Sequence, residues 1–304
     1  MESPRIAVVP QPIPAIRDAV EAGGGTVVDP GDAGGVIWTD PRDGDGLAAL
    51  LGEHGEHLRW VHLPYAGIER WAGILDRDRT WTCAKEIYGH QVAELALALL
   101  LAGFRNIGRY AAATTWTDLG ERNLHGSRVV VLGGGGIAEH LIAMLTPFGC
   151  SIDVVRRHPG SMPGVDMVVG SDQLHDVLAA ADAAVIALAL TPETRGIVGA
   201  AELELMADHA WLVNVARGGH VVTDDLVAAL RAGTIGGAGL DVTDPEPLPD
   251  GHPLWDLDNC IITPHVANTW EMAVPSLAAQ TSENVRRFAA GEPLTGLVDV
   301  DLGY

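Results

Sequence analysis

Residues 128–145, RVVVLGGGGIAEHLIAML, give the clearest indication of the fold. Five mostly apolar residues predict a β-strand, four glycines predict a turn, and the apolar segment after them predicts a helix. A strand, a glycine turn and a helix in this order are typical of a dinucleotide-binding fingerprint, here Gly-x-Gly-x-x-Ala from Gly133 to Ala138.

The glycine turn predicts where a cofactor pyrophosphate would lie. Gly133 permits the tight turn, and Gly135 lets the backbone approach the phosphates. Gly136 and Ile137 lead into the helix, whose N-terminus favours negative charge through its N–H groups and its dipole. We therefore expect these four residues to contact a dinucleotide.

The next apolar run, at residues 152–155, ends in Arg156 and Arg157. The corresponding strand normally ends in Asp or Glu, which binds the ribose 2′-hydroxyl of NAD. An arginine fork instead suits a 2′-phosphate through charge-assisted hydrogen bonds. The sequence thus predicts a preference for NADP(H). Use of NAD(H) stays open, with the arginines as a solvated strand end.

Short apolar runs and helix-like segments alternate on both sides of this stretch. This alternation predicts two α/β units with mostly parallel sheets. The last helix follows the second series, so we expect it to pack back on the first unit. The predicted strands are residues 6–9, 26–28, 36–38, 59–63, 80–83, 128–132, 152–155, 184–188, 210–215, 237–242 and 260–263, and the principal helices are 14–22, 90–104 and 275–290.

Three polar residues follow the later strands: Arg217, Glu246 and His265. Ligands of an open parallel sheet bind at the carboxyl ends of its strands. Reduction of a 2-keto acid needs a cation for the substrate carboxylate and an acid for the carbonyl oxygen, which Arg and His supply. A carboxylate beside the imidazole favours its charged form. An arginine, a glutamate and a histidine at one edge of the sheet therefore predict the reduction of a 2-keto acid.

The segments around these residues resemble the D-isomer specific 2-hydroxyacid dehydrogenase family. The matching motifs are VNVARGG at 213–219, LDVTDPEPL at 240–248 and TPHVA at 263–267. The resemblance implies that Arg217 binds substrate, that His265 is the acid/base with Glu246 as its partner, and that Asp241 holds the nicotinamide amide. Along the cofactor we expect Leu190, Pro192, Val215 and Ala216.

The first half of the chain agrees with this resemblance. The segment LPYAGIE at 63–69 looks like the family's substrate loop, so the amides of Tyr65, Ala66 and Gly67 are expected to hold the carboxylate. Arg156 with Arg157, TPET at 191–194 and the ending at 298–304 look like the glyoxylate/hydroxypyruvate reductase branch. That branch uses NADPH to reduce small 2-keto acids to D-2-hydroxy acids.

The family implies an α/β fold of two Rossmann-like domains with parallel sheets. Its dinucleotide-binding domain, expected at residues 94–274, is inserted into a flavodoxin-like substrate domain, expected at 1–93 and 275–304. The family also implies a homodimer. No metal is needed for this chemistry.

Composition limits the partners. The 304 residues include 47% hydrophobic and 19% charged residues, and 19 basic against 40 acidic residues give a net charge of −21. Nucleic acids and anionic membranes are therefore excluded as partners held by the overall field. Three cysteines far apart indicate neither a disulfide framework nor a zinc site. With no evident secretory signal or long apolar segment, we expect a cytoplasmic protein.

Two alternatives stay open at this stage. One is a dehydrogenase of the same chemistry for bulkier or phosphorylated 2-hydroxy acids, and the other is a nucleotide-sensing protein like the family's transcriptional corepressors. Trp38 and Trp270 could line the substrate pocket or belong to the core. Lys85 is the only lysine of the sequence, and we expect it near the cleft.

Overall fold

The structure is a computed structural model that describes residues 3–179 and 181–301. It divides into two compact units, Met1–Tyr88 with Thr269–Tyr304, and Gly89–Asn268. The chain passes from one unit to the other just before α3 (Gly89–Phe104) and α9 (Trp270–Ala290), whereas the boundaries expected from the sequence, 93/94 and 274/275, lie inside these helices. Each helix is one hydrogen-bonded cylinder, so it stays whole within its unit.

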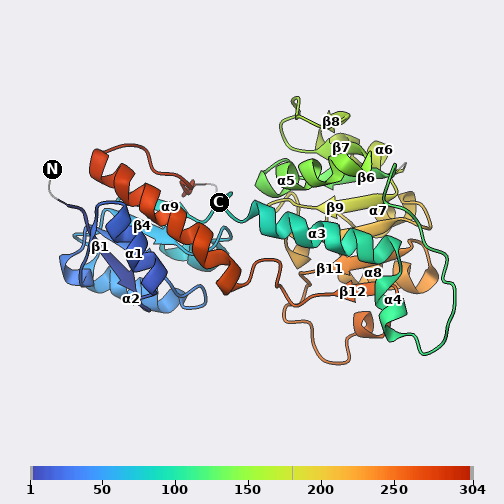
Figure 1. The fold of residues 1–304 in the computed structure, drawn as a ribbon, viewed down its shortest axis with the longest axis horizontal. Coiled ribbons are helices and arrows are strands. Elements are labelled where there is room, and N and C mark those ends of the chain that lie inside the picture. The colour runs from blue at the N-terminus through green and yellow to red at the C-terminus, as the bar shows by residue number, and fades with distance from the viewer. Residues whose placement is uncertain (1–2, 180, 302–304) are drawn as a thin grey trace. The chain divides into compact units, whose positions relative to one another are not determined.

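The first unit, blue with α9 in red in Figure 1, contains a five-stranded parallel sheet. Its strand order is β2-β1-β3-β4-β5, which is the flavodoxin-like order. Helices α1 and α9 cover one face through Ile16, Val20 and Leu277, and α2 covers the other through Leu47. The elements are β1 (Arg5–Val9), α1 (Pro14–Ala22), β2 (Thr26–Val27), β3 (Gly35–Trp38), α2 (Gly44–His54), β4 (Trp60–Leu63), β5 (Thr80–Cys83) and α9.

The second unit is a seven-stranded parallel sheet in the order β12-β11-β10-β9-β6-β7-β8. Its strand order reverses between β6 and β9, which is where α/β sheets bind ligands. Helices α3 and α5 cover one face, and α6, α7 and α8 cover the other. The elements are α3, α4 (Ile107–Ala112), β6 (Arg128–Leu132), α5 (Gly136–Leu145), β7 (Ser151–Val155), β8 (Met167–Val169), α6 (Leu174–Leu178), β9 (Ala183–Ile186), α7 (Ala200–Leu205), β10 (Trp211–Asn214), α8 (Thr223–Ala232), β11 (Gly237–Leu240) and β12 (Cys260–Ile262).

The predicted fold class is confirmed. Residues 129–132 of β6 are fully buried, as the unbroken apolar run of a parallel strand covered on both faces requires. Strand β8 was not predicted, because three residues at a sheet edge carry too little pattern. The last three residues of the ending at 298–304 lie outside the described residues. No helix in the described part of the chain is long and apolar enough to cross a bilayer.

A buried histidine makes the stability of the first unit depend on pH. His62 of β4 is fully buried, and its Nδ1 lies 2.7 Å from Thr82 Oγ1. Trp60 Nε1 donates to the same hydroxyl. Burial lowers the pKa of His62 from 6.5 to about 3, because a charged ring would lose its hydration.

We predict that the free energy of unfolding contributed by His62 is complete above pH 6.5 and is lost as the pH falls toward about 3. In that window the unfolded chain binds a proton that the folded ring refuses, which gives a slope of about 1.4 kcal/mol per pH unit. Urea denaturation across this range should show a shallower pH dependence for His62→Gln than for the control His57→Gln, whose side chain is exposed. Equal slopes in the two variants would contradict the assignment.

Candidate active site

The glycine turn has the geometry that a dinucleotide needs. Gly133 has φ 120°, and a Cβ there would lie 2.3 Å from the carbonyl oxygen of Ala187, so only glycine fits this turn. A Cβ on Gly135 would meet nothing within 4 Å, so this backbone is open to a ligand. Helix α5 begins at Gly136, followed by Ile137, and its first N–H groups have no acceptor within the helix. The turn therefore fits a pyrophosphate.

The two arginines after β7 lie in different surroundings. A Cβ on Gly134 would be 3.0 Å from Arg156 Cδ, so the Arg156 side chain lies against the glycine turn. Arg157 is exposed and its Nη2 lies 3.8 Å from Glu193 Oε2. Asp153, in the same strand, is buried, and its carboxylate is held by Arg128 at 2.6 Å. Of the two arginines, Arg156 is thus the one that lies beside the glycine turn.

The other expected cofactor residues follow β9 and β10. Leu190 lies beside the segment after β10, because a Cβ on Gly219 would be 3.3 Å from its Cδ2. Pro192 is exposed, whereas Val215 and Ala216 are each 5% exposed. The segments after neighbouring strands are further joined by the hydrogen bond from Gly196 N to the Gly219 carbonyl.

Arg217 follows β10 and is held through its own carbonyl. This oxygen accepts a hydrogen bond of 2.8 Å from Asn214 Nδ2, and it lies 3.0 Å from His220 Nδ1. A carbonyl only accepts, so the His220 proton is on Nδ1. Burial lowers the pKa of His220, which keeps this ring neutral. The guanidinium also donates to the Ala216 carbonyl at 2.7 Å.

His265 and Glu246 form a dyad at the same sheet edge. His265 Nδ1 lies 2.7 Å from Glu246 Oε1, and both side chains are partly exposed. Glu246 follows β11 and His265 follows β12, which are neighbours in the sheet. With Nδ1 engaged by the carboxylate, Nε2 is the ring nitrogen that can exchange a proton with a ligand.

Asp241 joins the segments after β11 and β12. The residue is 2% exposed, and its carboxylate accepts hydrogen bonds from Thr263 Oγ1 at 2.6 Å, Val266 N at 2.9 Å and Ala267 N at 3.0 Å. Its carbonyl accepts from His265 N at 2.8 Å. His265 has φ 54°, a left-handed conformation that is uncommon for residues other than glycine. Asp241 therefore accepts hydrogen bonds from residues before and after His265 as well as from His265 N itself.

The first unit carries the expected substrate loop after β4. Tyr65 is half-buried, and its ring packs edge to face on Tyr88 at 6.4 Å and on Trp270 at 6.1 Å. The Tyr88 hydroxyl donates to the Pro64 carbonyl at 2.8 Å. Ala66 is exposed and Gly67 is half-buried. Burial raises the pKa of Tyr65, so its phenol stays neutral.

The structure places the two tryptophans and the lysine whose roles the sequence left open. Trp270 packs on the loop through Tyr65, whereas Trp38 is 2% exposed within the core beside Leu47 and Trp71. Lys85 follows β5, the strand beside β4. Asn214 and His220 were not among the predicted residues. Asn214 had one usable signal, since it is the only polar residue in an otherwise apolar strand segment, 211–216.

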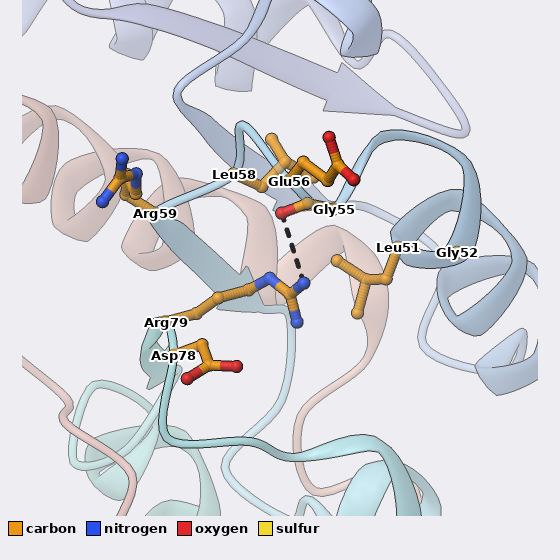
Figure 2. A pocket seen from close by; sticks show the side chains of 8 residues that line it. All are labelled: Leu51, Gly52, Gly55, Glu56, Leu58, Arg59, Asp78 and Arg79. Atoms are coloured by element: carbon orange, nitrogen blue, oxygen red, sulfur yellow. Dashed lines mark hydrogen bonds between the residues drawn. The ribbon is translucent and has the colours of Figure 1, made fainter.

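A hollow of about 450 Å³ lies at the opposite edge of the first unit (Figure 2). Leu51, Leu58, Arg59 and Arg79 are among its lining residues, and Arg79 donates to the Gly55 carbonyl at 3.2 Å. Arg59 precedes β4 while Tyr65 follows it, so the hollow is at the amino ends of the strands. It contains none of the predicted site residues.

Comparison with known proteins identifies the family. Residues 95–267 match the family described as D-isomer specific 2-hydroxyacid dehydrogenase, NAD binding domain. An uncharacterized protein in the proB 3′ region of Corynebacterium melassecola is 40% identical over 82% of this chain and 84% of its own length. The glyoxylate/hydroxypyruvate reductase A of Photorhabdus laumondii is 36% identical over 71% of this chain and 69% of its own length.

A solved structure agrees over the whole chain. The D-isomer specific 2-hydroxyacid dehydrogenase of Xanthobacter autotrophicus Py2, in complex with NADPH and MES, has a TM-score of 0.85 and 30% identity and covers 100% of both chains. The resemblance predicted from the motifs is confirmed. The chain belongs to the D-isomer specific 2-hydroxyacid dehydrogenase family, a family of NAD(P)-dependent oxidoreductases.

Proposed function

We propose that the chain reduces glyoxylate, hydroxypyruvate or a similar small 2-keto acid to the D-2-hydroxy acid, with NADPH as the preferred reductant. The observation that carries this proposal is the 2.7 Å contact between His265 Nδ1 and Glu246 Oε1, beside the strand that delivers Arg217. The similarity to a glyoxylate/hydroxypyruvate reductase A supports the substrate class.

The two units take different parts of the reaction in this proposal. The segment expected as the cofactor domain, 94–274, holds the dinucleotide on the turn at Gly133, Gly135, Gly136 and Ile137, with Leu190, Pro192, Val215 and Ala216 along it. The segments expected as the substrate domain, 1–93 and 275–304, contribute the amides of Tyr65, Ala66 and Gly67. These amides and Arg217 bind the substrate carboxylate.

The bound cofactor supplies a hydride from its nicotinamide C4 to the carbonyl carbon of the substrate, C2. His265 gives the proton from Nε2 to the carbonyl oxygen, so the alcohol forms without an unprotonated oxyanion. Glu246 orients the ring and stabilises its charged form through Nδ1. Arg217 fixes the carboxylate and so aligns the carbonyl with the acid.

The experiment that tests the proposal is a turnover assay at the nicotinamide absorbance band. NADPH and NADH are each offered with glyoxylate, hydroxypyruvate, pyruvate and phenylpyruvate, and D-product is identified by chiral chromatography. We expect NADPH oxidation with glyoxylate and hydroxypyruvate. Tight NADPH binding without turnover of any of these acids would reject the reductase and favour a nucleotide sensor.

We predict that His265→Gln lowers kcat/KM by about 10²–10⁴-fold, since proton transfer by a positioned side chain contributes this much. Glu246→Gln should have a smaller effect in the same direction, because the ring stays but loses its anionic partner. The matched control is His175→Gln. His175 Nε2 lies 2.7 Å from Glu202 Oε1, a pair of the same chemistry away from the sheet edge. A comparable loss in the control would point to folding instead of catalysis.

We predict that Arg156→Gln lowers the ratio of kcat/KM with NADPH to kcat/KM with NADH by about tenfold or more, as loss of one charge-assisted hydrogen bond would. Arg157→Gln should change the ratio less, because Arg157 is exposed and lies near Glu193, whereas Arg156 lies against the glycine turn. Arg231→Gln, on the exposed last turn of α8, controls for the change in net charge. An unchanged ratio in Arg156→Gln would assign the arginine to a solvated strand end.

We predict that Asp241→Asn lowers kcat by about tenfold or more, because one oxygen that accepts from the His265 segment is replaced by a donor. The control is Asp225→Asn, since Asp225 also accepts from a backbone N–H, that of Ala200, at 3.0 Å. Steady-state kinetics and thermal unfolding of both variants separate the outcomes. A loss of kcat that is equal in both would remove Asp241 from the positioning of His265.

A further inference from the structure

The carbonyl just before the expected substrate loop is bound from inside the first unit. The Tyr88 hydroxyl donates a hydrogen bond of 2.8 Å to the Pro64 carbonyl, and both residues are buried. Burial raises the pKa of the Tyr88 phenol, which therefore keeps the proton that it donates. This hydrogen bond fixes the orientation of the peptide that joins Pro64 to Tyr65.

A second carbonyl of the loop has a weaker partner of the same kind. Cys83 Sγ lies 3.8 Å from the Ala66 carbonyl oxygen, to which it is a weak S–H donor. Cys83 ends β5, the strand beside β4, and is 1% exposed. Burial raises the pKa of its thiol to about 11, so the thiol also keeps its proton. The carbonyls of Pro64 and Ala66 thus both face donors from the interior of the unit.

Peptide geometry links these two carbonyls to the N–H groups that follow them. Both peptides are trans, and in a trans peptide the C=O and the N–H of one plane point in opposite directions. Because the carbonyls face the two buried donors, the N–H groups of Tyr65 and Gly67 point away from these donors. Within the described residues neither N–H donates a hydrogen bond, so both are available to a ligand.

We propose that Tyr88 is a positioning residue for substrate binding. Its hydroxyl holds the Pro64 carbonyl and thereby turns the Tyr65 N–H toward the C1 carboxylate of the keto acid. Cys83 does the same, more weakly, for the Gly67 N–H. This inference rests on the proposed function and adds to it the groups that hold the substrate amides in place. Amides that are fixed in advance avoid the cost of ordering the loop when the substrate binds.

Tyr88→Phe tests the inference by removing one oxygen atom. The ring, which packs on Tyr65 at 6.4 Å, is kept. We expect KM for glyoxylate and hydroxypyruvate to rise by about three- to tenfold, as the loss of one hydrogen bond allows. The value of kcat should stay within about twofold and the Kd of NADPH should not change, because this hydroxyl serves only the binding of the carboxylate. Steady-state kinetics, NADPH titration and thermal unfolding measure these quantities.

The matched control is Tyr110→Phe. The Tyr110 hydroxyl also binds the backbone, since it accepts from Leu119 N at 2.9 Å, but it lies in the second unit. This variant removes the same atom from the other tyrosine whose hydroxyl is bound to the backbone in the described residues. It should keep the wild-type KM for both acids.

A second pair of variants tests the other peptide. Cys83→Ala should raise KM by about two- to threefold, because an S–H donor is weaker than a phenol. Its control is Cys150→Ala, since Cys150 Sγ lies 3.3 Å from the Leu124 carbonyl in the second unit. The double variant Tyr88→Phe/Cys83→Ala should raise KM more than either single change, because the two N–H groups bind one carboxylate.

Oxamate separates failure of this inference from failure of the proposed function, because it is an unreactive analogue of pyruvate that keeps the carboxylate. Its Kd for the NADPH complex, measured by titration calorimetry, should rise in Tyr88→Phe by the same factor as KM. An unchanged KM and oxamate Kd in Tyr88→Phe, a fall of kcat without a rise of KM, or an equal rise of KM in Tyr110→Phe overturns the inference.

In each of these three cases, turnover by the wild type leaves the proposed function intact. Oxamate binding that weakens in Tyr88→Phe, in a protein that turns over none of the acids, would instead reject the proposed function and support the positioning role. A wild type that neither turns over an acid nor binds oxamate would overturn both.

Discussion

The parallel register of three neighbouring strands sets the geometry of the candidate active site. Asn214 of β10 lies opposite Leu240 of β11, and Leu240 lies opposite Ile262 of β12. The segments after the three strands therefore leave the sheet at one level, and the functional side chains follow within a few residues. Their spacing is then set mainly by strand separation, about 4.8 Å between neighbours, with short loops adding little freedom. A site built this way is pre-organised by the same hydrogen bonds that hold the sheet.

Asp241 fixes the position of His265 by accepting hydrogen bonds from the residues on either side of it. A left-handed non-glycine residue costs about 1–2 kcal/mol, whereas each hydrogen bond to a charged group contributes about 1.5–3 kcal/mol. The Asp241 carboxylate accepts three such bonds, from Thr263, Val266 and Ala267. Together these hydrogen bonds contribute more than the left-handed conformation of His265 costs. The conformation of His265 is thus a property of a buried carboxylate one strand away.

The sequence predicted what local pattern and strand order determine. The glycine turn, the strand ends and the residues Arg217, Glu246 and His265 needed only the rule that parallel strands end at one edge. The hydrogen bonds that Asp241 accepts around His265, and the one that His220 donates to the Arg217 carbonyl, depend on which donor meets which acceptor after folding. The pairing of Arg157 with Glu193, from separate segments after β7 and β9, is of the same kind. No periodicity in one chain carries that information, and β8 is too short to show any.

A net charge of −21 and a site for anionic ligands are compatible because of where the carboxylates point. Charges beyond a Debye length of about 8 Å are screened at physiological salt, so a bound anion responds to its immediate neighbours. Near the candidate site, Asp241 accepts hydrogen bonds from the protein's own backbone, and Asp153 is paired with Arg128. Their negative charge is thus held by local donors, while Arg156 lies against the glycine turn. The cation beside the glycine turn therefore lies where a phosphate would bind, although the protein as a whole is strongly acidic.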